Sequence, residues 1–151
     1  MDYSIDDLEF KNLKIIQNQD GFCFGIDSVL LADFAKGIKK DAKVLDLGVG
    51  TGIISILLCG KTNLSNITGV EIQEEVAEMA NRSSKLNNLE KKFKVLNENI
   101  INLKTIYDKQ SFDAIVTNPP YKKNNTGLKS DDYKNLVSRH EIECTLEDII
   151  V

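Results

Sequence analysis

The amino-acid sequence predicts an α/β fold in which helices cover both faces of a parallel, doubly wound sheet. Strand-like and helix-like segments alternate between residues 43 and 117, and a cluster of glycines follows the first of these strands. The chain has 151 residues, of which 42% are hydrophobic, enough for one domain with its own core. Right-handed crossovers favour the spatial order 3-2-1-4 for the four strands.

The segment that precedes this sheet is expected to form a hairpin followed by a helix. The turn sequence Asn18-Gln19-Asp20-Gly21 lies between two short runs, Leu13–Gln17 and Phe22–Phe24, which are the expected strands. A helix is expected next, with Asp27 or Ser28 as its N-cap.

Each element of the sheet region has its own local signal. Short apolar runs that end in glycine, asparagine or proline indicate buried strands, and apolar residues at helical spacing indicate helices. In chain order, we expect a strand at Lys43–Leu47, a helix at Ile53–Cys59, a strand at Asn66–Glu71, a helix at Gln73–Asn87, a strand at Phe93–Leu96, a short helix at Ile100–Tyr107 and a strand at Phe112–Thr117.

Composition excludes several classes of protein. The acidic N-terminus has no apolar signal core and no apolar run reaches transmembrane length, which favours a cytoplasmic protein without a membrane partner. The three cysteines, Cys23, Cys59 and Cys144, are scattered, and His140 is the only histidine, so neither a disulfide framework nor a metal site is expected. Cys59 is interpreted as a core residue, and a catalytic role is not expected for His140.

The net charge of −4 does not indicate a nucleic-acid binder, but positive charge gathers after residue 121. Such a local patch can bind phosphates, and the alternative is an ordinary solvated loop. The basic residues of this segment are Lys122, Lys123, Lys129, Lys134 and Arg139, against Asp131 and Asp132.

The segment Asp46-Leu47-Gly48-Val49-Gly50-Thr51-Gly52 is the first candidate binding motif. Three glycines after a strand allow a tight turn and a close approach of the backbone to a ligand. The spacing differs from the dinucleotide pattern, and the acid before it would repel a pyrophosphate. It suits a cationic ligand such as the ammonium of a methionine moiety. The alternative is a glycine-rich turn with a capping aspartate.

Glu71 ends the second strand of the sheet, in register with the glycine segment. In doubly wound folds an acid at this place binds ribose hydroxyls. The alternative is a solvated carboxylate at the start of a charged run.

Asn118-Pro119-Pro120-Tyr121 directly follows the fourth strand. The prolines stiffen the turn. The Asn118 side-chain oxygen and the Pro119 carbonyl can accept two hydrogen bonds from one NH2 group, which positions a planar nitrogen for methyl transfer. Tyr121 offers a flat face on which a base can stack. The alternative is a simple Asn-Pro turn.

With these motifs in this order, the chain resembles the class I S-adenosylmethionine-dependent methyltransferases of the Asn-Pro-Pro-Tyr group, which have a Rossmann-like fold. Within that group it is similar to the bacterial valine-tRNA adenine-N(6)-methyltransferases. The narrower resemblance lies in residues 16–32, which contain Phe24-Gly25-Ile26-Asp27, and in Ser138–Glu141 and Cys144–Asp148.

The resemblance implies S-adenosylmethionine as cofactor and assigns residues to two sites. The implied catalytic residues are Asn118, Pro119, Pro120 and Tyr121, and the implied cofactor-binding residues are Phe24, Gly25, Asp27, Asp46, Gly48, Gly50, Gly52, Glu71, Ile72, Asn99 and Asn118. Two positions depart from the group. Asn99 stands where Asp commonly contacts the adenine, and Val49 replaces a more usual Thr or Cys.

The resemblance implies an N-methyltransferase acting on the exocyclic amine of adenine in RNA, with tRNA as the expected partner. Members of the group also methylate rRNA guanine, DNA adenine and release-factor glutamine, and those substrates remain alternatives. The release-factor enzymes usually carry an N-terminal helical domain, which the short segment before Lys43 does not supply.

We also expect residues 1–151 to be a single, truncated S-adenosylmethionine-binding domain. A capping-box pattern at Thr145–Asp148 predicts a helix start only a few residues before Val151, and the group continues with further strands. A fragment that binds cofactor without activity is therefore a third alternative. The fourth strand, Phe112–Thr117, would then be an open edge, from which we expect self-association or cover by residues 122–140.

Overall fold

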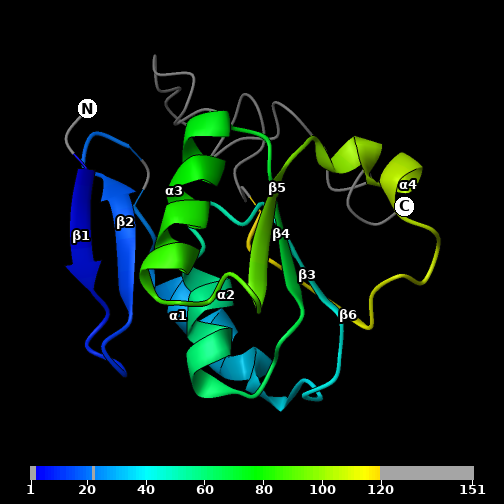
Figure 1. Cartoon of the computed structure of the whole chain (residues 1–151), viewed down its shortest axis with the longest axis horizontal. Coiled ribbons are helices and arrows are strands. Elements are labelled where there is room, and N and C mark those ends of the chain that lie inside the picture. Colours follow the sequence, from blue (N-terminus) through cyan, green and yellow to red (C-terminus); the bar gives the residue numbers. More distant parts are fainter. Residues whose placement is uncertain (1–2, 22, 120–151) are drawn as a thin grey trace.

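The computed structural model describes residues 3–21 and 23–119, which form an α/β fold with a hairpin beside a four-stranded sheet (Figure 1). The strands are β1 (Tyr3–Asp7), β2 (Lys14–Asn18), β3 (Val44–Leu47), β4 (Ile67–Glu71), β5 (Phe93–Asn97) and β6 (Ala114–Thr117). The helices are α1 (Ile26–Phe34), α2 (Ile53–Lys61), α3 (Glu74–Leu86) and α4 (Leu103–Ile106), with 3₁₀ turns η1 (Ala35–Gly37) and η2 (Ile100–Asn102).

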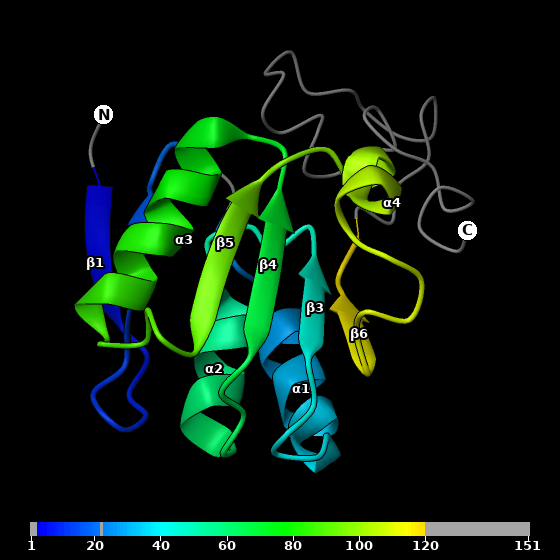
Figure 2. The same cartoon turned by 45° about the vertical axis from the view of Figure 1, so that its right-hand side comes forward.

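The four-stranded sheet is parallel, and its spatial order is β5-β4-β3-β6 (Figure 2). This confirms the predicted order 3-2-1-4, because β3 is the first strand of the sheet along the chain. The strands lie within a few residues of their predicted bounds. The predicted short helix after β5 consists of η2 followed by α4.

The two faces of the sheet are covered by different elements. On β3, Val44 belongs to a large apolar cluster that includes residues of α1 and α2. Its neighbours Leu45 and Leu47 point to the other face, where Ile100 and Leu103 of η2 and α4 cover them. This alternation is what a strand with two buried faces requires, and it makes the sheet doubly wound.

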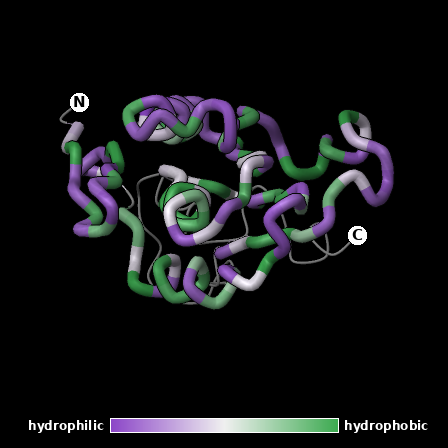
Figure 3. Tube along the Cα trace, turned by 60° about the horizontal axis from the view of Figure 1, so that its bottom comes forward, coloured by the Kyte–Doolittle hydropathy of each residue, from purple (hydrophilic) through white to green (hydrophobic). Residues whose placement is uncertain are grey.

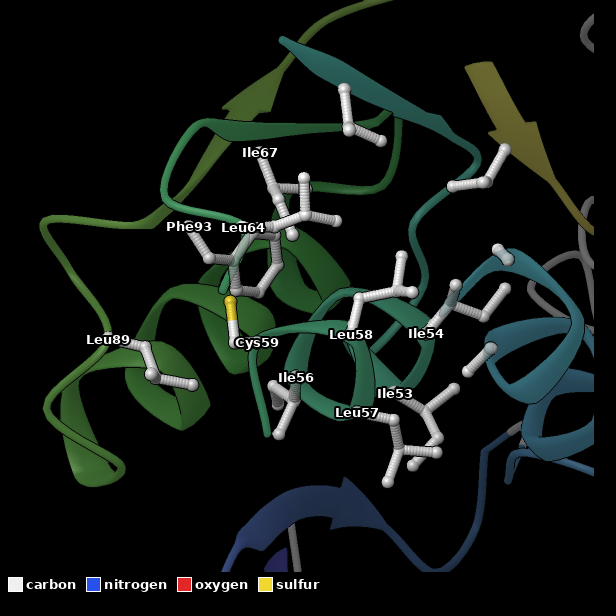
Figure 4. Close-up of a cluster of buried hydrophobic side chains, with 14 of the residues drawn as sticks. Ile53, Ile54, Ile56, Leu57, Leu58, Cys59, Leu64, Ile67, Leu89 and Phe93 are labelled. Carbon is white, nitrogen blue, oxygen red and sulfur yellow. The ribbon is translucent and has the colours of Figure 1, made fainter. Parts of the chain in front are cut away.

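The helix α2 is the centre of the larger core. All residues from Ile53 to Cys59 are buried, so the helix is enclosed on every side. Figure 4 shows the apolar side chains of this helix in one cluster with Leu64, Ile67, Leu89 and Phe93. In Figure 3 the helix at the centre of the view is accordingly largely hydrophobic, while the trace around it carries many hydrophilic residues.

The N-terminal segment does form a hairpin, but the prediction of its two strands is wrong. Residues 18–21 do turn, with Gly21 N donating to Asn18 O at 3.0 Å. However, β2 pairs with the preceding strand β1, and the described residues Cys23 and Phe24 belong to no strand. The signal for β1 is absent from the sequence because its half-buried positions are polar, Ser4 and Asp6, whereas its Ile5 is 60% exposed.

The other edge of β2 is bonded by a side chain of α3 and by that of its C-cap residue, Asn87, in place of a strand. Ser83 Oγ accepts from Ile16 N at 2.9 Å, and Asn87 bonds both the N–H and the carbonyl of Lys14, at 2.8 Å and 2.6 Å. These contacts satisfy backbone groups that would otherwise be exposed. They tie the hairpin to the helix beside which it lies in Figure 1.

Several predictions fall on residues outside the described ranges and stay predictions. No helix in the part of the chain that the structure describes is long and apolar enough to cross a membrane. The predicted features outside it are Pro120 and Tyr121, the basic residues between Lys122 and Arg139, His140, Cys144 and the helix start at Thr145.

Candidate functional site

The predicted functional residues gather at one edge of the sheet because the parallel strands end in register. Leu47 of β3 pairs with Val70 of β4 on one side and with Thr117 of β6 on the other. The next residue of each strand therefore emerges at the same edge: Gly48, Glu71 and Asn118. This is the carboxyl edge of the sheet, where ligands of doubly wound folds bind.

The glycine segment after β3 is built from left-handed backbone. Gly48, Gly50 and Gly52 have φ values of +67°, +56° and +93°. A Cβ added at Gly48 or Gly50 would meet nothing within 4 Å, whereas one at Gly52 would lie 3.1 Å from the Phe93 ring. The first two glycines therefore border open space that a ligand can approach, and the third permits close packing of α2 on β5.

The glycine segment is anchored to β4 by Val49. Its N–H donates to Val70 O at 3.0 Å, and its side chain is buried. A Cβ at Gly69 would lie 2.7 Å from Val49 Cγ2, so Val49 packs directly on the bare backbone of Gly69. Because the loop is held in this way, its backbone N–H groups have fixed positions.

Asp46 is completely buried on β3, with Ser55 Oγ donating to its Oδ2 at 2.7 Å. Its Oδ1 has no hydrogen-bond partner among the described residues. Burial raises the pKa of Asp46 to about 7, the Ser55 hydrogen bond opposes this rise, and the charge of Glu71 adds to it. A buried acceptor without a partner is costly, so this atom is suited to a ligand donor.

Glu71 is buried at the end of β4, and both of its carboxylate oxygens are engaged. Oε2 accepts from Gly50 N at 3.1 Å, and Oε1 accepts from Gln73 N at 3.0 Å. Burial raises the pKa of this carboxyl, while the hydrogen bonds from the backbone N–H groups of Gln73 and Gly50 lower it. Glu71 thus connects the strand end to the glycine segment and is not a solvated charge.

Asn118 follows β6 and contacts the start of α1. Its amide nitrogen donates to Asp27 Oδ2 at 2.9 Å and to Ser28 Oγ at 3.1 Å. The preceding residue, Thr117, donates its hydroxyl to Leu47 O at 2.9 Å, which holds the end of β6 against β3. The structure therefore brings Asn118 and Asp27 together from positions far apart in the chain.

Three other predicted residues make contacts within the protein near this edge. Phe24 packs against the large core, and its N–H donates to Gln17 Oε1 at 3.2 Å. The carbonyl of Ile72 accepts from Asn97 Nδ2 at 3.0 Å. Asn99 caps η2, because its Oδ1 accepts from Ile101 N at 3.0 Å, so that oxygen is already engaged.

Sequence reasoning missed four residues that shape this edge. Ser55 donates a hydrogen bond to Asp46, and Gly69 leaves the space that the Val49 side chain fills. Gln17 accepts a hydrogen bond from the backbone of Phe24. Ser28 was expected only as a helix cap, but its hydroxyl accepts from Asn118. No local pattern identifies the partners of a buried serine or glutamine. The only signal was a polar residue inside an apolar segment.

Taken together, this edge offers space above two glycines, two buried acidic groups and one oriented amide. Such a set can bind a ligand that carries both a cation and hydroxyl groups, next to an NH2-bearing substrate. Within residues 3–21 and 23–119, no group of three or more His, Cys, Asp or Glu residues could hold a metal ion.

Comparison with known proteins shows a match to the Methyltransferase small domain family over residues 9–139. A Porphyromonas gingivalis relative named tRNA1(Val) (adenine(37)-N6)-methyltransferase is 30% identical over 152 residues, covering 96% of this chain and 58% of that protein. A release factor glutamine methyltransferase of Fusobacterium nucleatum is 28% identical, covering 99% of this chain and 41% of that protein. The chain thus spans less than two thirds of these relatives.

A solved structure supports the same fold. The S-adenosylmethionine-dependent methyltransferase from Agrobacterium tumefaciens matches with a TM-score of 0.60 at 18% identity, covering 80% of this chain and 40% of that chain. At this identity the likeness concerns the fold, which is the Rossmann-like fold of methyltransferases.

Proposed function

Because the chain belongs to the Methyltransferase small domain family, whose methyl donor is S-adenosylmethionine, we propose that it methylates the exocyclic amine of adenine in RNA. We expect tRNA to be the RNA substrate and the cytoplasm to be the compartment. The observation that carries the proposal is the position of Asn118, at the same sheet edge as Gly48 and Glu71. This position supports a role for the Asn118 amide as an acceptor next to the expected cofactor site.

The residues at this edge fit the cofactor. Gly48 and Gly50 leave space for it, since a Cβ on either would meet nothing. Asp46 Oδ1, which has no partner among the described residues, would accept from the ammonium of the methionine moiety, and Glu71 would also accept from ribose hydroxyls. When bound, S-adenosylmethionine supplies an electrophilic methyl group on a sulfonium.

The chain's own groups would position the nucleophile. Asn118 Oδ1 and the Pro119 carbonyl accept two hydrogen bonds from the NH2 group, which directs the nitrogen lone pair towards the methyl group. Pro120 would stiffen the turn, and the ring of Tyr121 would stack on the base. These groups would hold the nitrogen in place while it takes the methyl group that the cofactor would supply, and the surplus proton would leave to water.

Support for an RNA substrate comes from the Porphyromonas relative and from the basic residues that follow Tyr121. The Fusobacterium relative supports a second candidate, transfer to the amide nitrogen of a protein glutamine. Both acceptors are planar NH2 groups, so the geometry at Asn118 suits either one. We also propose that residues 1–151 form one cofactor-binding domain. A further alternative is that this domain binds the cofactor without catalysing methyl transfer.

The test is a methyl-transfer assay on the purified chain with labelled S-adenosylmethionine. The substrates are an unmodified tRNA transcript, an rRNA fragment, a DNA duplex and a release-factor peptide that contains glutamine. Nucleosides from the digested RNA are then identified by mass spectrometry, with Asn118→Ala as the inactive control. We expect N6-methyladenosine in the tRNA and none in the control.

Each other outcome has a definite meaning. Label in the peptide alone would establish the glutamine alternative. Cofactor binding without transfer to any substrate would show that residues 1–151 bind the cofactor but do not catalyse methyl transfer. Label in the RNA that persists in Asn118→Ala would remove the residue on which the proposal depends.

A further inference from the structure

The side-chain amide of Asn118 is held in one orientation by two groups at the start of α1. Its nitrogen donates to Asp27 Oδ2 at 2.9 Å and to Ser28 Oγ at 3.1 Å. A carboxylate can only accept hydrogen bonds, so the group that faces Asp27 must be the NH2. Asn118 Oδ1 therefore faces away from α1.

This orientation matters because an asparagine amide turns easily. Its terminal torsion is broad and roughly two-fold, so an unsupported side chain would present nitrogen and oxygen in turn. An exposed NH2 would repel the NH2 of an acceptor. Only the carbonyl end of Asn118 can accept a hydrogen bond from it.

Gly25 provides the space that the Asp27 carboxylate occupies. A Cβ on Gly25 would lie 2.5 Å from Asp27 Oδ1. The backbone of Gly25, at φ −101° and ψ 173°, is open to any residue, so the glycine is needed for space and not for its conformation. An alanine here would displace the carboxylate without straining the backbone.

We propose that Asp27 and Ser28 are positioning residues, which fix the amide of Asn118 so that its oxygen faces the acceptor nitrogen, with Gly25 leaving room for the carboxylate. This role rests on the proposed function. It differs from the cofactor contact that the resemblance implies for Gly25 and Asp27. The bonded pair is 91 residues apart in sequence, so the contact depends on the packing of α1 near the end of β6.

The orientation itself can be measured without any activity. In ¹⁵N NMR of the full chain, the side-chain NH2 signals of Asn118 are assigned by their loss in Asn118→Ala. Hydrogen bonds to a carboxylate and a hydroxyl should protect these protons, so Asp27→Ala and Gly25→Ala should each speed their exchange on the order of tenfold or more. Asp33→Asn is the control, because Asp33 lies on the same helix but pairs with Lys36 and Lys61.

The role in transfer is measured on the substrate that the assay above identifies. Asp27→Ala should slow single-turnover methyl transfer on the order of 100-fold, as expected for a misplaced reacting group. The Kd for S-adenosylhomocysteine should stay nearly unchanged. The transfer rate of Asp27→Asn should lie between those of the wild type and Asp27→Ala. The amide oxygen introduced at position 27 can still accept from Asn118, whereas the introduced NH2 favours the wrong orientation of Asn118.

Two results would overturn the inference. One is an unchanged exchange rate of the Asn118 NH2 protons in Asp27→Ala. The other is a loss of S-adenosylhomocysteine binding as large as the loss of rate, which would return Asp27 to the cofactor site. Failure of the wild-type chain to methylate any substrate would count against the proposed function alone, because the NMR comparison still decides whether Asp27 orients Asn118.

Discussion

Ser55 Oγ on α2 donates a hydrogen bond of 2.7 Å to Asp46 Oδ2 on β3, while Asp46 Oδ1 has no hydrogen-bond partner among the described residues. Burial raises the pKa of Asp46 from 3.8 to about 7. Between these values the folded chain holds a proton that the unfolded chain has lost. Stability from this group is therefore fully present below about pH 4 and is lost as the pH rises through about 7.

We therefore expect the Tm of the cofactor-free chain to fall between about pH 5 and about pH 8, and Asp46→Asn to reduce this fall. The side chain introduced at position 46 in the variant is uncharged at both pH values, and its amide oxygen can still accept the hydrogen bond from Ser55. Calorimetric scans of both chains at the two pH values check the prediction. Parallel pH dependence in wild type and variant would show that Asp46 is not the group responsible.

Removing the charge of Glu71 should weaken cofactor binding. In Glu71→Gln one oxygen is lost, so Gly50 N and Gln73 N can no longer both be satisfied as they are now. Titration calorimetry should show a Kd for S-adenosylhomocysteine raised by roughly tenfold or more, since a hydrogen bond to a charged group contributes about 1.5–3 kcal/mol. The exposed Glu90→Gln serves as control. Binding of NAD in preference to this cofactor would refute the site assignment.

The glycines of the loop should separate binding from stability. Gly50→Ala and Gly52→Ala both place an alanine in backbone of positive φ, which costs roughly 1–2 kcal/mol for a left-handed residue, and Gly52 at φ +93° lies further from the tolerated region. Only the second adds a methyl group 3.1 Å from the Phe93 ring. Urea unfolding should therefore show that Gly52→Ala loses more stability than Gly50→Ala. Titration calorimetry on the folded variants should show that Gly50→Ala loses more affinity for the cofactor than Gly52→Ala. The reverse pattern would mean that Gly50 does not border the ligand.

Asn118→Ala should abolish methyl transfer and leave cofactor affinity nearly intact. The side chain serves the acceptor nitrogen, so its loss lowers turnover more than ground-state binding. Tyr121→Ala should impair transfer to a base strongly and Tyr121→Phe much less, because stacking needs only the ring. Single-turnover rates and S-adenosylhomocysteine titrations measure the two effects. An equal loss of cofactor binding in Asn118→Ala would assign the residue to the fold.

The chain should associate with itself through α1 and β6. Ile26, Leu30 and Phe34 lie four residues apart on α1 and are 73%, 63% and 87% exposed. In the described part of the chain β6 pairs only with β3, and its Ile115 is 58% exposed. Such an edge with apolar neighbours favours pairing with another chain.

Light scattering should thus report species larger than the 16.9 kDa monomer, decreasing in Phe34→Lys and in Ile115→Lys. Leu86→Lys on α3 is the matched control, since Leu86 is 41% exposed on a different element. A monodisperse monomer at every concentration would contradict the prediction.

The sequence by itself determined the alternating strands and helices, the order of the sheet and the positions of Gly48, Glu71 and Asn118 at its edge. These features follow from local signals: apolar runs, helical spacing, glycines after a strand and prolines that end one. Parallel strands in register then bring the strand ends together without further information. That is why the general fold was predictable, whereas the cofactor was implied by the resemblance to the methyltransferases.

The tertiary structure alone decided what each side chain does there. The pairing of β1 with β2, the burial that raises the pKa of Asp46, and the bond between Asp27 and Asn118 all depend on contacts between distant segments. Local periodicity carries no information on which polar groups meet across the core. Their partners are set by how α1, α2 and α3 pack on the sheet and hairpin, because buried polar groups must bond whatever that packing brings near.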